Sequence, residues 1–403
     1  MKKYYAWAIC LGGLILQFWT IGLASNCFGV FLPYFRSELG LLNSQTSTFV
    51  TVRCLFGFIG VLLIKKYYEK LDLRLGMAVA CFLFGVGLIA WGFGQNFITC
   101  IFGLVPLGIA YGFGNMYSVT IALNRWFKLH YGLALSICVA GSGIAAIIMP
   151  PVMNSLLESK GLRFTVLSLG IASIVSSLLI FLLVRNTPEE MGLTPFGSEK
   201  HLSKAEEKIA NHAYSGKSPR EIFLFLAVLL FGIVAIGSTN HFSVLFIDLG
   251  YTPELAALSV STFGLCLMIF KLIYGALVDK FGTFVVNTVY FVLGIAGFFI
   301  SALLCRGSVV MMVLSTGLIG VGLVLTSIGY TMFAKDLYPK DKADDVNQHI
   351  QMANMLGGTL FSTLPGIIAD KVGSYAPSFF IYGVMMIIIA VSITAMYIRR
   401  MNR

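Results

Sequence analysis

The sequence predicts an all-α membrane protein with twelve transmembrane helices in two pseudo-symmetric halves of six helices. Three observations support this fold class. Twelve apolar runs are each long enough to cross a bilayer, which takes about 20 residues. One long polar segment, between about 185 and 221, divides these runs six and six. A short motif also recurs at equivalent places in the two halves.

The composition indicates a protein that lies in lipid. Of the 403 residues, 58% are hydrophobic and 11% are charged, and the mean hydropathy is +0.87. Soluble domains carry about 25% charged residues. The net charge of +10 does not favour nucleic-acid binding, because the basic residues are spread over short loops and not gathered on one soluble face.

The apolar runs give the expected spans in chain order. In the first half they are 6–33, 46–64, 75–95, 98–122, 131–156 and 162–184. In the second half they are 221–247, 255–278, 284–304, 309–333, 346–369 and 376–398. The first run is too long for the apolar core of a signal peptide, so we expect it to be retained. The expected organisation is an N-terminal half 1–184, a cytoplasmic linker 185–220 and a C-terminal half 221–403.

The basic residues predict the orientation in the membrane. With both termini cytoplasmic, 21 of the 28 Lys and Arg residues fall in inner segments and five in outer ones, leaving Arg53 and Lys271 within spans. Positive residues are retained on the inner side. We therefore expect a multi-pass protein of the bacterial cytoplasmic membrane with both termini and the linker inside.

The eight cysteines indicate neither disulfides nor a metal site. They lie in or beside apolar runs and form no CxxC or His/Cys ligand spacing. We interpret them as small apolar residues. No cofactor or metal is expected. These cysteines are Cys10, Cys27, Cys54, Cys81, Cys100, Cys138, Cys266 and Cys305.

Two cations lie inside apolar runs, and every one of the 18 acidic residues lies in a connecting segment or at the edge of a run. An ionised side chain in a bilayer is costly and is usually reserved for an ion or substrate pathway. Lys271 lies eight residues before Asp279, about 12 Å along a helix. Substrate binding is the favoured interpretation, and the alternative is a lysine that snorkels to the headgroups or forms a structural pair.

Arg53 lies sixteen residues before Glu69, about 24 Å along the helix, which places it in the outer half of its span. It is expected to bind or attract anions. The alternative is a gating pair with an acid at the outer end, such as Asp370 or Asp248.

Other polar residues occur on spans that are expected to line a cavity. Most such side chains only cross-link neighbouring helices. His241 is the imidazole deep in a span, which makes it the leading proton-coupling candidate. The remaining candidates are Gln17, Asn26, Asn115, Tyr117, Tyr330 and Asn354.

The repeated motif follows the second span of each half. After the eighth span the sequence reads Gly275-Ala-Leu-Val-Asp279-Lys280-Phe-Gly282, and after the second span Glu69-Lys70 keeps the acid and base without the glycines. A third copy, Gly366-Ile-Ile-Ala-Asp370-Lys371-Val-Gly373, follows the eleventh span on the outer side. The alternative is chance, since turns favour these residues.

With this motif and twelve spans, the whole chain resembles the major facilitator superfamily, in which two six-helix halves rock around a midplane site. The resemblance implies that a conformational motif braces one state across the halves. Its residues here are Glu69, Lys70, Gly275, Asp279, Lys280 and Gly282.

A narrower resemblance is to the bacterial branch of monocarboxylate transporters and oxalate/formate antiporters. Segments 29–33 with 38–40, 124–151, 187–192 and 373–375 carry it. The resemblance implies that Lys271 binds the substrate carboxylate, with tyrosines in spans four and ten, here Tyr117 and Tyr330. The branch's second cation in span eleven is missing, because Gln351-Met-Ala-Asn354 stands there, and this favours a single carboxylate.

The expected function is secondary active transport of a small organic anion, a monocarboxylate, by alternating access with proton symport or anion exchange. The alternatives are an exporter of other small organic solutes or drugs by proton antiport, a passive channel, and a transporter-like sensor. No catalytic constellation is present in a fitting context, so an enzyme is not expected. The expected partners are the carboxylate, protons and lipid, without nucleic acid, and the protein is expected to be a monomer.

Overall fold

The chain forms long helices in the computed structural model, which describes residues 5–197, 219–329, 332–333 and 340–401. Across the first half the elements are α1 (Tyr5–Gln17), η2 (Phe18–Asn26), η3 (Phe28–Phe31), α2 (Leu32–Leu39), α3 (Asn43–Lys70), α4 (Leu73–Gly92), α5 (Phe97–Phe113), α6 (Met116–Trp126), α7 (Tyr131–Leu183) and η4 (Glu189–Met191). The others are α8 (Pro219–Asp248), α9 (Pro253–Phe281), α10 (Thr283–Leu303), α11 (Val309–Leu323), η6 (Val324–Thr326), α13 (Lys340–Phe361), α14 (Leu364–Val372) and α15 (Ala376–Met401).

The expected all-α membrane fold is confirmed. Within the described residues, eleven helices are long and apolar enough to cross a membrane. One of them, α7, bends at Gly161, which has φ 81° and ψ 171°. A positive φ suits glycine, which has no Cβ to clash. The parts on either side, 131–160 and 162–183, are each long enough for one crossing, so the expected fifth and sixth spans are both present.

Several expected spans are interrupted. The tenth passes from α11 into η6, a 3-10 helix, and the eleventh breaks between α13 and α14. Two further interruptions lie in the first half. The first span continues from α1 into η2, which is a π-helix, and the fourth breaks between α5 and α6. At this break Asn115 caps α6, since its side chain accepts a hydrogen bond from the N–H of Met116. π-Helical turns are rare and frequently occur at functional sites.

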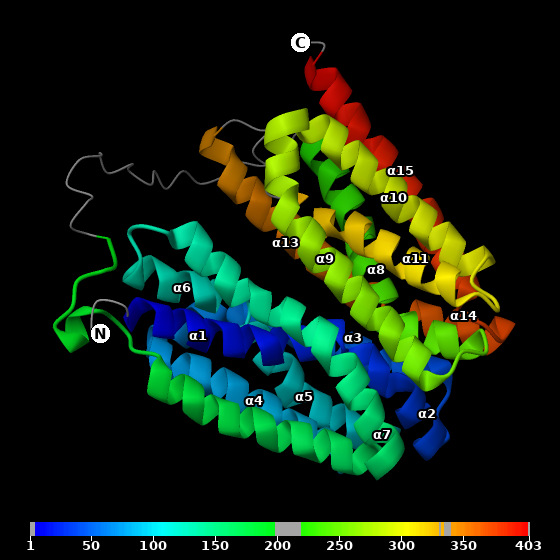
Figure 1. The fold of residues 1–403 in the computed structure, drawn as a ribbon, viewed down its shortest axis with the longest axis horizontal. Helices are drawn as coiled ribbons and strands as arrows, with labels where there is room; N and C mark the ends of the chain where they lie inside the picture. Colours follow the sequence, from blue (N-terminus) through cyan, green and yellow to red (C-terminus); the bar gives the residue numbers. More distant parts are fainter. Residues whose placement is uncertain (1–4, 198–218, 330–331, 334–339, 402–403) are drawn as a thin grey trace. The chain divides into compact units, whose positions relative to one another are not determined.

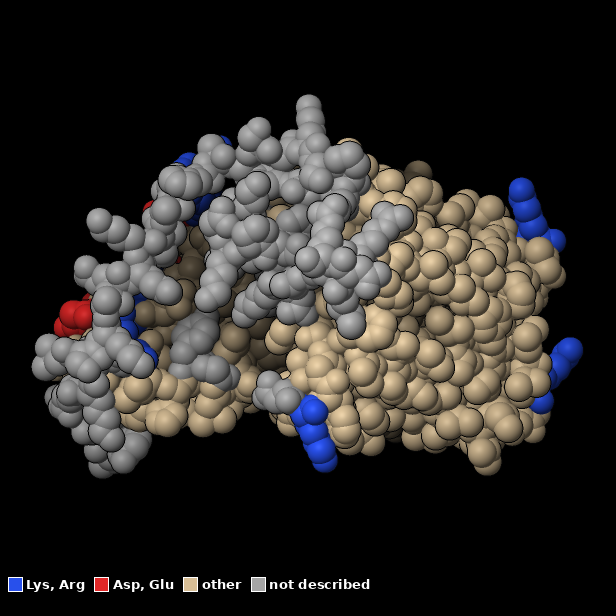
Figure 2. Space-filling model, turned by 90° about the horizontal axis from the view of Figure 1, so that it is seen from above, with Lys and Arg blue, Asp and Glu red and all other residues tan. Residues whose placement is uncertain are grey.

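The surface of the described residues is largely apolar. Large side chains such as Phe102 and Val310 are 70% and 73% exposed. Figure 2 shows broad areas without charge on the visible face, with the described charged side chains at their margins. Lipid is the solvent in which such a surface is stable.

The contacts divide the chain into two compact units. Unit 1 comprises Met1–Cys27, Val52–Ala145 and Leu156–His212, and unit 2 comprises Phe28–Thr51, Ala146–Ser155 and Ala213–Arg403. Unit 2 thus contains short segments of the expected N-terminal half together with the whole C-terminal half. The division at 1–184, 185–220 and 221–403 stays a prediction, since the units follow contacts and not the repeat.

Within unit 1, α4 packs closely on α5, with α1 against α6 (Figure 1). Trp91 and Trp126 are fully buried in this unit. Within unit 2, α8 packs on α13 and α9 on α11, while α10 contacts both α11 and α15 (Figure 1).

The start of the linker is docked on unit 1. The Phe196 N–H donates to the Trp126 carbonyl at 2.8 Å, and the N–H groups of Lys128 and Leu129 donate to the Phe196 carbonyl. The Phe196 ring lies against Trp7 and Phe127, with ring centroids 5.9 and 5.7 Å away. Residues up to Phe196 are therefore part of the folded unit.

Candidate functional site

Arg53 is fully buried on α3, in unit 1. Its guanidinium lies 5.6 Å from the ring centroid of Tyr111 on α5, and its Nη2 is 3.3 Å from the Cys54 Sγ. A cation over an aromatic face is attracted by the ring's negative face. The Tyr111 ring is therefore one of the groups that make burial of this charge tolerable.

Lys271 lies on α9, in unit 2, half-buried within the helix segment Pro253–Val278 that is apolar enough to span. Among the described residues no side chain forms an ion pair or hydrogen bond with it. The nearby polar side chain of Tyr274 is buried and donates to the Asn287 Oδ1 at 2.6 Å. The described part of the chain therefore supplies no anion to Lys271.

His241 is fully buried on α8, in unit 2. Its Nε2 is 2.9 Å from the Ser47 Oγ, and its Nδ1 is 2.6 Å from the Gly237 carbonyl oxygen. A carbonyl can only accept, so Nδ1 carries a proton and donates to Gly237, and the Ser47 hydroxyl is the hydrogen-bond partner of Nε2. The Tyr375 ring lies 5.4 Å away. Burial raises the pKa of Tyr375, which therefore keeps its proton.

The remaining candidate binding residues are divided between the units. In unit 1, Tyr117 is 43% exposed on α6, and the Asn26 Nδ2 donates to the Ser142 carbonyl at 3.3 Å. In unit 2, Asn354 is half-buried on α13. Tyr330 lies outside the described residues. Each unit therefore contains part of the expected binding set: Arg53, Tyr117 and Asn26 in one, and Lys271, Asn354 and His241 in the other.

The residues of the conformational motif lie at helix ends. Glu69 and Lys70 are exposed at the end of α3. Gly275 and Lys280 are exposed on α9, and Lys280 Nζ is 5.2 Å from the Phe281 ring centroid. Gly282 ends this helix with φ 81°. The side chain of Asp279 lies outside the described residues, so its bracing role stays a prediction.

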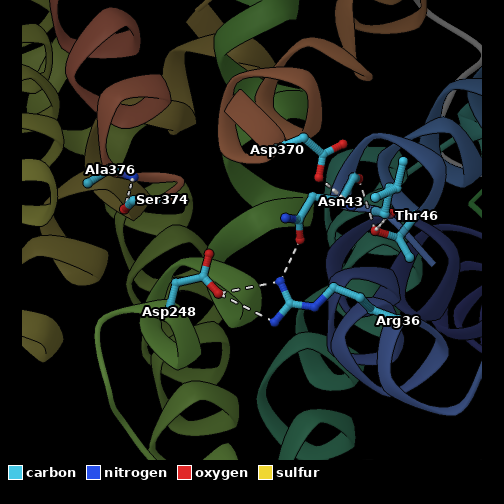
Figure 3. A network of polar contacts seen from close by, with 8 residues as sticks. Arg36, Asn43, Thr46, Asp248, Asp370, Ser374 and Ala376 are labelled. Carbon is cyan, nitrogen blue, oxygen red and sulfur yellow. Dashed lines mark hydrogen bonds and ion pairs between the residues drawn. The ribbon is translucent and has the colours of Figure 1, made fainter. Parts of the chain in front are cut away.

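Sequence reasoning missed a polar network in unit 2 (Figure 3). Arg36 on α2 pairs with Asp248 at the end of α8, with 3.4 Å between Nη1 and Oδ1. Asp370 on α14 accepts from the N–H groups of Asn43 and Ser44. These are the acids suggested as partners of Arg53, and both have partners elsewhere. In the sequence, Asp370 stands out as the acid in the third copy of the repeated motif.

No metal site is evident in the described residues, where no group of three or more His, Cys, Asp or Glu side chains could hold an ion.

Residues 14–347 and 242–403 match the sequence model of the Major Facilitator Superfamily. The MFS-type transporter pynF of Aspergillus niger is 26% identical over 192 residues, 46% of this chain and 43% of that protein. MFS-type transporter 1 of an Ophiocordyceps species is 21% identical over 294 residues, which cover 71% of this chain and 61% of that protein. The agnestins efflux protein AgnL12 of Paecilomyces divaricatus is 23% identical over 286 residues, which cover 68% of this chain and 61% of that protein.

The chain therefore spans between 43% and 61% of the length of these three fungal relatives. Among solved structures, the nucleoside transporter NupG has a TM-score of 0.76 at 15% identity, covering 96% of this chain and 99% of that one. The D-xylose-proton symporter has a TM-score of 0.74 at 15% identity and covers 96% of both chains. At this identity the likeness shows the fold alone.

Proposed function

Because this chain belongs to the Major Facilitator Superfamily, whose members are secondary transporters, we propose that it carries a small organic anion, a monocarboxylate, by alternating access. The observation that carries the proposal is Lys271. It lies within a membrane span, and no described side chain neutralises it.

A cation in a site that closes away from water is costly, because its hydration is lost in a medium of low dielectric. A bound carboxylate removes that cost by supplying the missing negative charge. The loaded carrier is then easier to close than the empty one. This difference is what a carrier needs to couple binding to reorientation.

One cation in the second half, Lys271, matches one carboxylate. In the eleventh span, Asn354 stands in a segment with no Lys or Arg, so a dianion would lack a second charge partner there. We propose that Asn26, Tyr117, Tyr330 and Asn354 supply neutral hydrogen bonds to the substrate and that Arg53 attracts it. The return step would be completed by a second anion or by a proton carried through His241.

The second candidate is export of other small organic solutes or drugs by proton antiport. It is favoured by the relatives, one of which is named as an efflux protein. An exporter of organic cations would need an acid in its cavity, and the sequence places all its acids in connecting segments or at the edges of apolar runs. Those relatives are fungal, so they do not favour the bacterial membrane expected above.

The test is uptake of radiolabelled lactate, pyruvate or acetate into proteoliposomes. The wild type should accumulate at least one of these acids, and Lys271→Ala should reduce the rate by more than about tenfold, the effect of 1.4 kcal/mol. Lys160→Ala, an exposed lysine of the connection between the fifth and sixth spans, is the matched control. If Lys271→Ala takes up the acid as fast as the wild type, Lys271 is not the anion-binding residue. Efflux of an organic cation would favour the exporter.

A further inference from the structure

We propose that Arg36, Asn43, Asp248, Gly366 and Asp370 form an outer clamp. It fastens the start of the second span onto the seventh and eleventh spans and thereby holds the predicted outer side closed. All five residues lie in unit 2, and each comes from the end of a helix that faces the predicted outer side. The inference rests on transport by alternating access and not on the identity of the substrate.

The carboxylate of Asp370 binds the N-terminus of α3. This helix begins at Asn43, and its first N–H groups have no partners within the helix. The Asp370 oxygens lie 2.8 and 2.9 Å from the nitrogens of Asn43 and Ser44. A carboxylate at this position is favoured both by charge-assisted hydrogen bonds and by the positive end of the helix dipole.

Gly366 allows α14 to come this close. A Cβ at this position would overlap the Asn43 carbonyl oxygen and the Ser47 Oγ. Gly366 precedes Asp370 by one helical turn, so both lie on the same face of α14. The third copy of the repeated motif is thereby explained by contact. Its glycine makes room for the helix that its aspartate binds.

Arg36 and Asp248 form the second contact of the clamp. Their side chains are 28% and 12% exposed, so the pair is partly shielded from water. Arg36 also donates to the Asn43 Oδ1. Asn43 therefore joins the two contacts, since its side chain binds Arg36 while its N–H binds Asp370 (Figure 3).

Deeper hydrogen bonds continue the row along α3. Ser47 contacts His241, and the Thr51 hydroxyl is 2.6 Å from that of Thr363. Residues 43, 47 and 51 are spaced by four and lie along one face of the helix. In a carrier that alternates, such contacts between the expected halves must break and re-form. Polar groups suit this role because water can replace their partners when they separate.

The experiment measures opening by the reactivity of a buried reporter. Thr46 is fully buried beside the clamp, and among the described residues its hydroxyl donates to the carbonyls of Leu42 and Asn43, just before and at the start of α3. Thr46→Cys, in a protein without the eight native cysteines, is reacted with a membrane-impermeant maleimide in right-side-out vesicles. We expect Asp370→Asn, Gly366→Val and Arg36→Asp each to raise the labelling rate by about tenfold, equivalent to 1.4 kcal/mol.

Two controls and a rescue separate the clamp from general loosening. Glu158→Gln and Arg163→Glu change exposed charges at the connection between the fifth and sixth spans and should leave labelling unchanged. Arg36→Asp combined with Asp248→Arg re-creates the pair with reversed charges and should restore protection. If Gly366→Val does not fold, this swap decides. The clamp is contradicted if Asp370→Asn and Arg36→Asp leave the labelling rate of Thr46→Cys unchanged. It is also contradicted if the charge swap does not lower the labelling rate from that of Arg36→Asp.

Discussion

The His241 imidazole on α8 hydrogen-bonds the Ser47 hydroxyl on α3, with 2.9 Å between Nε2 and Oγ, and both residues are fully buried. A buried hydrogen bond contributes about 1 kcal/mol net. Ser47→Ala should therefore lower stability by about 1 kcal/mol, measured as thermal unfolding in detergent. Ser243→Ala is the matched control, since this buried serine of α8 has a hydroxyl without a partner among the described residues. An equal loss in both variants would show that the contact contributes nothing specific.

Tyr375 should make the protein sensitive to alkaline pH. Burial raises its pKa, so on unfolding the phenol becomes more acidic, with an ordinary pKa of about 10. This group stabilises the fold below about pH 10, and the contribution is lost as the pH rises further, because the unfolded state releases its proton first. Tyr375→Phe should therefore lose stability less steeply between about pH 10 and 11, by up to 1.4 kcal/mol per pH unit. Chemical unfolding at several pH values measures this slope, and Tyr117→Phe, at an exposed tyrosine, should keep the wild-type slope.

Tyr111 should stabilise the buried Arg53 through its ring. Removing the ring in Tyr111→Leu should lower stability by about 1 kcal/mol, whereas Tyr111→Phe keeps an aromatic face and should cost less. Thermal unfolding of both variants in an Arg53→Met background separates the pair from simple packing. If Tyr111→Leu costs the same with and without Arg53, the cation contributes nothing to the contact.

The orientation predicted from the basic residues can be checked with reporters fused to the C-terminus. A fluorescent protein that matures only in the cytoplasm should be bright, and an alkaline phosphatase that is active only outside should be silent. Addition of four lysines to the connection 304–308 should weaken this preference, because positive residues are retained inside. A silent fluorescent fusion with an active phosphatase would invert the topology and would place the clamp on the inner side.

The span pattern could be predicted because lipid imposes a strong and local rule on sequence. Each crossing needs an apolar run, and Gly161 between two such runs is where α7 turns. The break before Asn115 and the π-helix at Phe18–Asn26 both lie within apolar sequence, so hydropathy does not predict them. The sequence therefore predicts where the spans lie but not where the helices within them break or change type.

The candidate site was accessible only in part. Lys271 and Arg53 stand out because isolated charges in apolar runs are rare. The partners of Asp248 and Asp370 could not be deduced, since Arg36 is separated from Asp248 by 212 positions and Asn43 from Asp370 by 327. Such pairings depend on how whole helices pack. The repeated motif pointed to Asp370 as important without indicating what it binds.

The docking of Phe196 on Trp126 and Phe127 means that the folded surface of unit 1 extends beyond Leu183, where α7 ends. The N–H and the carbonyl of Phe196 are both hydrogen-bonded, and its ring packs on two aromatic side chains. An insertion between Leu183 and Phe196 should therefore displace this ring and expose the aromatic side chains that it covers.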